Sequence, residues 1–267
     1  MIIIIQTKNF KLFSLIRKLG VCSLMLLHTS CNGIFGWIYD EPLVSTKGQI
    51  VIDATSWGDW YYVDLNHLKE LSEQGDTTAL LKAQMEFEPY PIPMTLTTTS
   101  DGKSGQYMYW FDVFGEGIKK NEFRSYTPCD AQPEPREWTF AVHRNNVRTN
   151  NAAVFETHYS SMNDIPESSL TFRDKTYITD EWSENEVWDS QEQMLNCLVP
   201  SQGIMVNKLL SSWITVNIPP VPPSFSFNNH VFILRLKDGT YAALQLENYI
   251  SPTGKKCYLT INYKYPY

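Results

Sequence analysis

The segment Cys257–Tyr265, CYLTINYKY, is the stretch of the chain that decides the fold. Apolar or aromatic residues occupy every second position, and the residues between them are mostly polar. Because side chains of a β-strand point alternately to its two faces, this pattern predicts a strand with one buried and one solvated face, as in antiparallel sheets. The predicted buried face consists of Cys257, Leu259, Ile261, Tyr263 and Tyr265.

The segments that precede this strand predict more β structure. Residues 231–236 and 240–246 flank Lys237-Asp238-Gly239, and an Asp-Gly pair between two apolar runs predicts a β-hairpin. Leucines spaced three residues apart predict a short helix over residues 65–74, which Gly75 ends. No βαβ alternation is present, so we predict an all-β, mostly antiparallel fold with one or two short helices. Further strands are predicted at residues 49–54, 60–64, 138–143, 152–157, 175–179 and 212–217.

We predict a single domain over residues 49–267, with an elaboration at about residues 65–137. Three prolines at positions 89, 91 and 93 exclude a central strand there, because proline has no backbone N–H to donate. Residues 94–99 and 105–113 flank Ser-Asp-Gly-Lys and predict a hairpin. The second of these segments is rich in aromatic residues, so we expect the hairpin to pack on the domain.

Residues 1–30 are predicted to be a lipoprotein signal peptide. Four basic residues precede an apolar core of nine residues, which is much shorter than the roughly 20 residues of a spanning helix. Thr29-Ser30-Cys31 follows the core, and small residues directly before a cysteine are typical of bacterial lipoproteins. We therefore predict lipidation at Cys31, a tether over residues 31–48 and membrane attachment by lipid alone. The alternative is an ordinary signal peptide followed by an incidental cysteine.

The charge of the chain argues against nucleic acid as its main partner. The chain has 22 Lys and Arg against 29 Asp and Glu, a formal net charge of −7. Residues 1–30 contain four basic residues and no acidic one, so the mature chain has 18 basic and 29 acidic residues, net −11. Surfaces that bind nucleic acid are basic, since they neutralise phosphates. This net charge also gives the domain no general attraction to an anionic leaflet.

No motif in the sequence supports a named catalytic reaction or a structural zinc site. The GxSxG, HExxH, Walker and GxGxxG motifs are absent. Residues 180–192 contain six carboxylates, which could bind Ca²⁺, although a solvated face is the commoner use of such a run. Cys129, Cys197 and Cys257 remain after Cys31, and three cysteines at wide spacing allow at most one disulfide. The sequence therefore predicts a protein that is not an enzyme.

The segment Trp138–Asn150, WTFAVHRNNVRTN, resembles the W-x-x-A-x-H-R-x-x-V-R-x-N signature of the HmuY-like haem-binding lipoproteins of Bacteroidetes. The resemblance covers residues 49–64 and 138–267, including the predicted late hairpin and the closing strand. We interpret the polar and aromatic signature positions as structural. These positions are Trp138, His143, Arg144, Arg148 and Asn150.

This resemblance implies an extended, mostly antiparallel β protein, tethered by lipid to the outer membrane and facing the cell exterior. The best-studied members of the family that it resembles bind haem between two axial histidine or methionine side chains and pass it to a TonB-dependent receptor. The expected cofactor is therefore haem or a related tetrapyrrole, and the haem iron is the only metal expected. The expected partners are this ligand and the receptor.

The family's haem ligands do not all have counterparts in this sequence. One ligand follows a tryptophan-led strand, and its place here falls on Ile218, which cannot ligate iron. The other lies in the variable stretch before that strand, where Met194 and Met205 offer thioethers and no histidine occurs. Alternatively, both methionines are packing residues, as most methionines are. His158 and His230 are further candidates on strands where the family has no ligand.

Three hypotheses about function follow from the sequence. The first is a surface lipoprotein that binds haem or a related tetrapyrrole. The second is a lipoprotein of the same fold that recognises another ligand, or a partner protein, through residues 65–137. The third is an enzyme, which no motif in the sequence supports.

Overall fold

The computed structural model describes the part of the chain that carries the predicted fold. All described residues belong to one compact unit, Val44–Tyr267. They are residues 46–92, 132–183, 187–188, 191, 194, 204–217 and 222–267, together with the backbone of 105–111 and 120–126. Several predictions fall outside the described residues: the signal peptide, Cys31 and most of the tether, residues 94–99, Cys129, Cys197 and Ile218.

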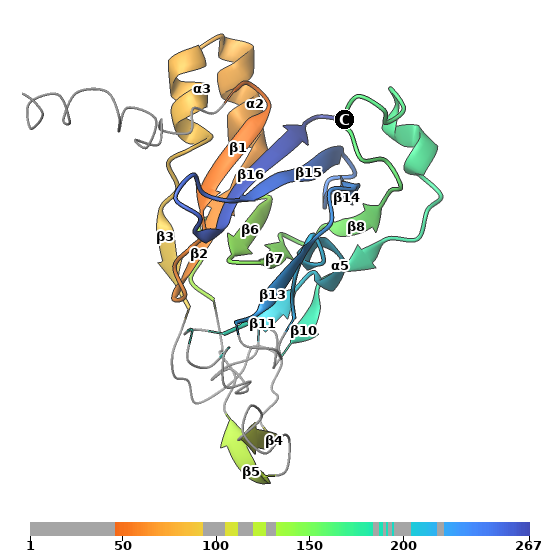
Figure 1. Cartoon of the computed structure of the whole chain (residues 1–267). Helices are drawn as coiled ribbons and strands as arrows, with labels where there is room; N and C mark the ends of the chain where they lie inside the picture. The colour runs from red at the N-terminus through yellow and green to blue at the C-terminus, as the bar shows by residue number, and fades with distance from the viewer. Residues whose placement is uncertain are drawn as a thin grey trace, which may run out of the picture. The chain divides into compact units, whose positions relative to one another are not determined.

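Every strand pair among the described residues is antiparallel, as the sequence predicted. The largest sheet has six strands in the order β1-β16-β15-β14-β8-β9 (Figure 1). Its strands are β1 (Gln49–Asp53), β8 (Ala153–Glu156), β9 (Ile178–Thr179), β14 (Val231–Arg235), β15 (Tyr241–Ile250) and β16 (Lys256–Lys264).

A second sheet has four strands in the order β3-β2-β6-β7. Three two-stranded sheets join β4 to β5, β10 to β11 and β12 to β13. The strands of these sheets are β2 (Asp59–Val63), β3 (Pro89–Pro91), β4 (Gly105–Phe111), β5 (Lys120–Tyr126), β6 (Phe140–His143), β7 (Asn146–Thr149), β10 (Glu181–Ser183), β11 (Ile204–Val206), β12 (Ile214–Asn217) and β13 (Ser224–Phe227). The proline-containing β3 lies at an edge, where the missing N–H groups are tolerated.

The closing strand β16 has the predicted alternation along most of its length. Leu259 and Ile261 are fully buried, and Lys264 is exposed. Thr260 differs from the prediction, because it is only 8% exposed on the face expected to be wet. The six-stranded sheet is in fact covered on parts of both faces: Val231 and Phe232 are neighbours on β14, yet they belong to two different apolar clusters.

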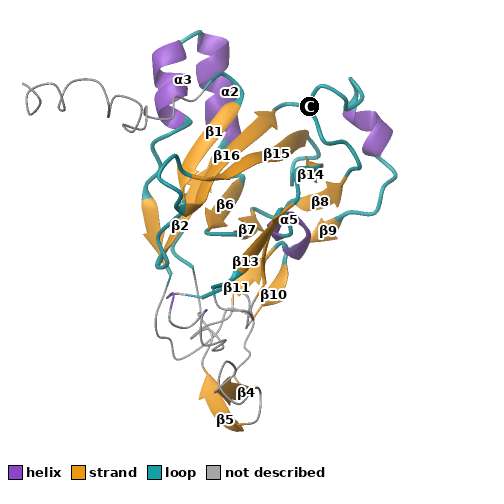
Figure 2. Cartoon of the chain, viewed as in Figure 1, coloured by secondary structure: helices purple, strands orange, loops and turns teal. Residues whose placement is uncertain are grey.

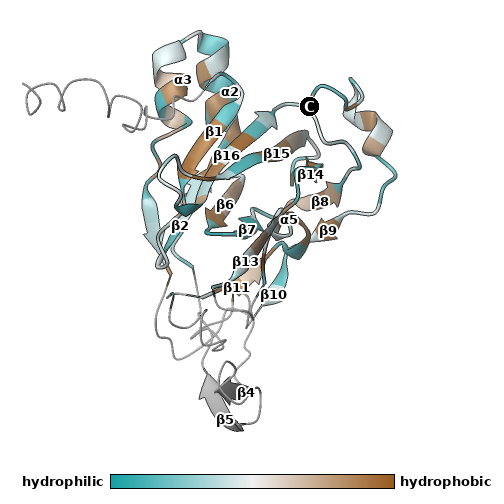
Figure 3. Ribbon diagram, in the orientation of Figure 1, coloured by the Kyte–Doolittle hydropathy of each residue, from teal (hydrophilic) through white to brown (hydrophobic). Residues whose placement is uncertain are grey.

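The main core contains side chains from both larger sheets and from three helices, one of which is the short α5 (Lys208–Ser211). Figure 2 shows helices α2 (Leu65–Gln74) and α3 (Thr77–Ala83) side by side, and Figure 3 shows the apolar colouring of β1. The Asp64 side chain accepts a hydrogen bond from the backbone N–H of Asn66 at the start of α2. The helix ends at Gly75, which has a φ of 74°. Buried leucines of α2 and α3 belong to the main core, so residues 65–83 contribute to the body of the fold.

Several local elements differ from the sequence prediction, among them β10, β11 and β13, which were not predicted. The strand β7 was not predicted, because its sequence NVRT has only one apolar residue. The short helix α5 (Lys208–Ser211) was not predicted and lies directly before the predicted strand 212–217, which begins at Ile214 in the structure. The strand β4 pairs with β5, which was not predicted, and the partner predicted for β4 lies outside the described residues. A separate small helix, η1 (Ser169–Phe172), is of the 3₁₀ type. In the described part of the chain, no helix has the length and apolar character to span a bilayer.

Candidate functional site

The signature residues occupy the two ends of the hairpin formed by β6 and β7. His143 pairs with Asn146, so the turn consists of Arg144 and Asn145 alone. His143 and Arg144 lie at the tip of the hairpin, whereas Arg148 lies near its base. The signature therefore describes one hairpin that is anchored at both ends.

At the tip, His143 is a buried neutral side chain. Its Nε2 lies 2.9 Å from the backbone oxygen of Trp57, and its ring centroid lies 5.4 Å from that of Trp60. Burial, together with the nearby Arg144 charge, lowers the pKa of His143 to about 4, although the hydrogen bond to the Trp57 carbonyl opposes this shift. Protonation would place an N–H at Nδ1, which is buried without a partner among the described residues. This environment supports the structural interpretation of His143.

Arg144, in the turn of the hairpin, contacts the loop that contains Thr55 and Trp57. Its φ of 54° is unusual for a residue with a Cβ. The Nη1 atom donates a hydrogen bond of 2.7 Å to the Thr55 carbonyl, and the guanidinium carbon lies 3.5 Å from the centre of the Trp57 ring. These contacts offset the strain of the left-handed turn.

At the base, Trp138 and Asn150 close the hairpin beyond its last strand pair. The Asn150 side chain donates a 2.8 Å hydrogen bond to the Trp138 carbonyl, and its backbone N–H donates to Thr139. The Trp138 ring meets Tyr62 edge-on, with ring centroids 5.0 Å apart. The Arg148 guanidinium lies 5.0 Å from the centre of the same tryptophan ring.

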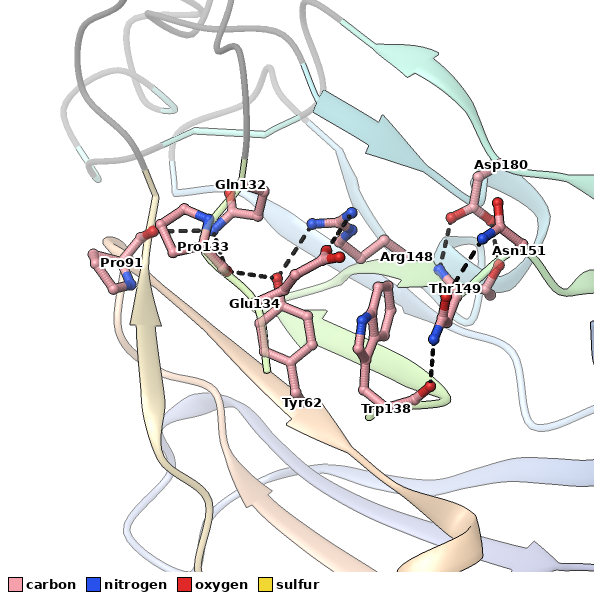
Figure 4. A network of polar contacts seen from close by, with 11 residues as sticks. Tyr62, Pro91, Gln132, Pro133, Glu134, Trp138, Arg148, Thr149, Asn151 and Asp180 are labelled. Carbon is pink, nitrogen blue, oxygen red and sulfur yellow. Dashed lines mark hydrogen bonds and ion pairs between the residues drawn. The ribbon is translucent and has the colours of Figure 1, made fainter. Parts of the chain in front are cut away.

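Arg148 connects this base to the loop before β6 (Figure 4). Its Nη1 donates to the Tyr62 hydroxyl at 3.2 Å, and its Nη2 lies 3.2 Å from a carboxylate oxygen of Glu134. The side chain is only 12% exposed, and its Nε is buried without an acceptor among the described residues. Burial raises the pKa of Tyr62 to about 12, although the Arg148 charge opposes this shift.

Asp180 accepts hydrogen bonds from β7 and from the residue before α5. The backbone N–H and the hydroxyl of Thr149 donate to its two oxygens at 2.6 and 2.8 Å, and the Asn207 amide donates at 3.0 Å. Burial nevertheless raises the pKa of Asp180 above its ordinary value, against the effect of these hydrogen bonds. Asn207 also caps α5 by accepting from the backbone N–H of Leu210. Asp180 is thus a structural acceptor in the described part of the chain, where no cluster of three metal-ligating side chains occurs.

The base of the hairpin opens into a pocket of about 260 Å³. Met205 of β11, opposite Trp182 in β10, lies on its wall with 38% of its surface exposed. We call this the signature pocket. It is lined by Glu134, Trp138, Arg148, Thr149, Asn150, Asn151, Ala152, Thr179, Asp180 and Met205. The sequence identified three of its signature residues and Met205, but it gave no sign that Glu134 and Asp180 would join them.

The other ligand candidates lie elsewhere. Met194 is 5% exposed and is not among the described residues that line the signature pocket. His158 is exposed and its ring is tilted against that of Tyr159, with ring centroids 4.2 Å apart. The Nδ1 atom of His230 lies 2.8 Å from a carboxylate oxygen of Glu156.

A second hollow, of about 350 Å³, lies beside β12. Its lining extends along the strand as far as Val216, which is two residues before Ile218 in the sequence. Trp188, Lys208 and Val216 are among its lining residues, and it shares no described residue with the signature pocket. The sequence placed candidate haem ligands at Met205 and directly after β12. Among the described residues, Met205 and the end of β12 line two different hollows.

Comparison with known proteins assigns the chain to a family. A model of the HmuY protein family matches residues 56–263. The chain belongs to the HmuY family. A search of curated proteins finds no match.

Several solved protein structures resemble the chain over most of its length. A HmuY-like haem-binding protein of Bacteroides vulgatus is 25% identical, with a TM-score of 0.52 and coverage of 84% of this chain and 97% of that chain. A protein of Bacteroides fragilis named as a lipoprotein is 23% identical, with a TM-score of 0.55 and coverage of 82% and 89%. The apo HmuY analogue of Tannerella forsythia is 18% identical, with a TM-score of 0.50 and coverage of 80% and 93%. The last two show likeness of fold alone.

The donor chemistry of the signature pocket fits the haem that membership of the HmuY family implies. Haem presents an iron, an apolar macrocycle and two carboxylates. The pocket has a thioether at Met205, the indole of Trp138 and an Arg148 Nε without an acceptor among the described residues. Its volume is slightly below the roughly 300–1,000 Å³ of most ligand pockets, so it would take only part of a tetrapyrrole.

Cys257 does not extend this site. Its thiol is free and buried in β16, and burial raises its pKa, so it is present mainly as the unreactive thiol. The question of a disulfide between Cys129 and Cys197 falls outside the described residues.

Proposed function

We propose that this HmuY family member is a lipid-anchored, surface-exposed binding protein of the outer membrane and not an enzyme. In this proposal it holds haem or a related tetrapyrrole at the signature pocket and passes it to a TonB-dependent receptor. The observation that carries the proposal is the presence, in one pocket, of an exposed methionine thioether and a buried arginine Nε without an acceptor among the described residues.

Met205 is the better of the two methionine candidates for the axial ligand. An axial ligand must present its sulfur to the iron, and Met205 is 38% exposed on a pocket wall. Met194 is almost fully buried, which is the ordinary state of a packing methionine. We therefore assign the iron-ligating role to Met205 and a packing role to Met194.

Arg148 is suited to bind a carboxylate of the ligand. Its two terminal nitrogens already interact with Tyr62 and Glu134, whereas the Nε proton has no acceptor among the described residues. Because this Nε is itself buried, the Arg148 side chain would have to shift toward the pocket to bind a carboxylate of the ligand, which would then relieve the penalty of about 1–3 kcal/mol for a buried donor without a partner. Bound haem would supply an iron that Met205 could ligate, while Arg148 fixes the position of the macrocycle.

Titration with haemin and with iron-free protoporphyrin tests this assignment. We expect Met205→Ala to weaken haemin binding at least about tenfold, because one bond to iron is lost. The same variant should bind protoporphyrin as the wild type does, because this ligand has no iron. Met194→Ala and the control Met85→Ala, which changes a methionine beside α3, should leave both affinities unchanged. The Soret absorbance shift measures each titration.

The pH dependence of the same titration separates methionine from histidine ligation. A thioether does not bind protons between pH 5 and 8, so haemin affinity should change little over this range. Ligation by His158 or His230 would instead weaken at low pH, because imidazole must lose its proton before it binds a metal. An unchanged Soret shift in Met205→Ala would refute ligation by this residue and direct the search to these histidines.

A second function is favoured by the polar character of the signature pocket. Seven of its ten lining residues are Asn, Thr, Asp, Glu or Arg, which is unusual for a site that holds an apolar macrocycle. A lipoprotein of the same fold that binds another, more polar ligand would use these groups. Absence of any Soret shift in the wild type, with ferric and with ferrous haem, would leave this function in place of haem binding.

A further inference from the structure

Two lysines of this acidic protein line one hollow of about 470 Å³, which we call the lysine pocket. Lys47 lies in the turn before β1, and Lys264 is the last residue of β16. The lining also includes the neutral polar residues Ser161, Asn163, Gln245 and Asn262. No carboxylate is among the described residues that line it, although acidic residues outnumber basic ones in the chain.

The fold brings the two lysines together through the pairing of β1 with β16. The backbone N–H of Tyr263 donates a 2.9 Å hydrogen bond to the Gly48 carbonyl, and each lysine is adjacent to one of these bonded residues. Gly48 has a φ of 85°, a conformation that suits glycine and lets the turn bend directly before the strand.

The charge of the lysine pocket is not neutralised by the described residues. Neither lysine forms an ion pair with a described residue, although Lys264 also lies 4.7 Å from the ring centre of Tyr267. The neighbouring Glu247 accepts a hydrogen bond from Gln49 at 2.9 Å and is not part of the lining. Two like charges that line one hollow repel each other, so an anion between the two lysines would be stabilising.

The position of the pocket along the chain suggests the source of the anion. Lys47 is the second described residue, and only 14 residues separate the predicted lipidation site Cys31 from Thr46. Fully extended, 14 residues reach about 50 Å, and a random coil of that length spans about 20 Å on average. The extended length is an upper limit on the separation between Thr46 and a lipid attached to Cys31, so the anchor would keep the pocket within about 50 Å of lipid headgroups.

We propose that the lysine pocket binds a phosphate group of the membrane lipids and thereby orients the domain on the membrane that carries its anchor. Lysine ammonium groups bind phosphate as point charges, and the neutral amides and the serine hydroxyl can donate the remaining hydrogen bonds. The net charge of −11 argues against general adsorption to an anionic surface. This inference concerns one local contact, and it rests on the lipid anchor of the proposed function but not on haem.

Vesicle sedimentation with the processed chain, residues 31–267 carrying Cys31→Ala, tests the proposal without the covalent anchor. We expect this chain to bind phosphatidylcholine vesicles that contain phosphatidate and not vesicles of phosphatidylcholine alone. Lys47→Gln or Lys264→Gln should each weaken binding about fivefold, and the double variant about 25-fold, since each lysine near an anionic surface contributes a similar increment. Lys175→Gln, an exposed lysine outside the pocket, is the matched control and should bind as the parent does.

Three outcomes would overturn the proposal. One is equal weakening in Lys175→Gln, which would indicate a general charge effect. Another is no binding of phosphatidate vesicles. The third is tight binding of inorganic phosphate, measured by calorimetry, without vesicle binding, which would make the site one for free phosphate. Haemin titration of the double variant keeps the two proposals apart, because we expect its Soret shift to match that of the wild type.

Discussion

Acidification from pH 7 to pH 4 should destabilise the folded chain by about 3 kcal/mol through His143 alone. Burial lowers the pKa of His143 to about 4 in the folded chain, whereas an exposed histidine has a pKa of 6.5. Between these two values the unfolded chain binds a proton that the folded chain does not. The free energy of unfolding is therefore fully retained above about pH 6.5 and falls as the pH drops towards 4.

The His143→Gln variant isolates this effect from other titrating groups. Glutamine keeps an N–H donor for the Trp57 carbonyl but does not titrate. Denaturant unfolding at several pH values should give a flatter stability profile for the variant than for the wild type between pH 4 and 6.5. Asp180, whose pKa is raised in the folded chain, changes stability with the opposite sign, but it does so equally in both proteins. Parallel profiles would contradict the assignment to His143.

Replacement of Cys31 by alanine should move the protein from the membrane fraction to the soluble fraction. The prediction rests on the apolar core of residues 19–27 and on the small residues directly before the cysteine. Without a thiol at this position no lipid can be attached, and the acidic domain has no second means of stable anchoring, since one weak headgroup contact does not replace an acyl anchor.

Fractionation of cells grown with labelled fatty acid measures both the location and the modification. The wild type should carry label and sediment with membranes, whereas Cys31→Ala should do neither. Cys129→Ala is a suitable control, because it removes a cysteine far from the signal and should keep the label. If Cys31→Ala stays with the membranes and the wild type is unlabelled, then the tether is not a lipid on this residue.

The elements that the sequence predicted correctly are those whose signal is local. The alternation in β16 and the Asp-Gly turn between β14 and β15 depend on neighbouring residues, and both are present in the structure. The same holds for α2, with its cap at Asp64 and its end at Gly75. The strand β7 was missed because its polar residues become buried only through partners far along the chain, such as Asp180 for Thr149.

The sequence by itself determined the family, the antiparallel class and the chemical types at the candidate site. The signature of thirteen residues, WTFAVHRNNVRTN, is enough to indicate the family. Apolar residues at every second position are enough to indicate the antiparallel class. Only the tertiary structure decided that His143 and Arg144 hold the tip of a hairpin while Arg148 and Met205 line a pocket near its base. Only the structure placed Lys47 and Lys264 at one hollow. The physical reason is that burial, pairing and pKa depend on contacts between segments that can be more than 200 residues apart, and no local pattern encodes which segments meet.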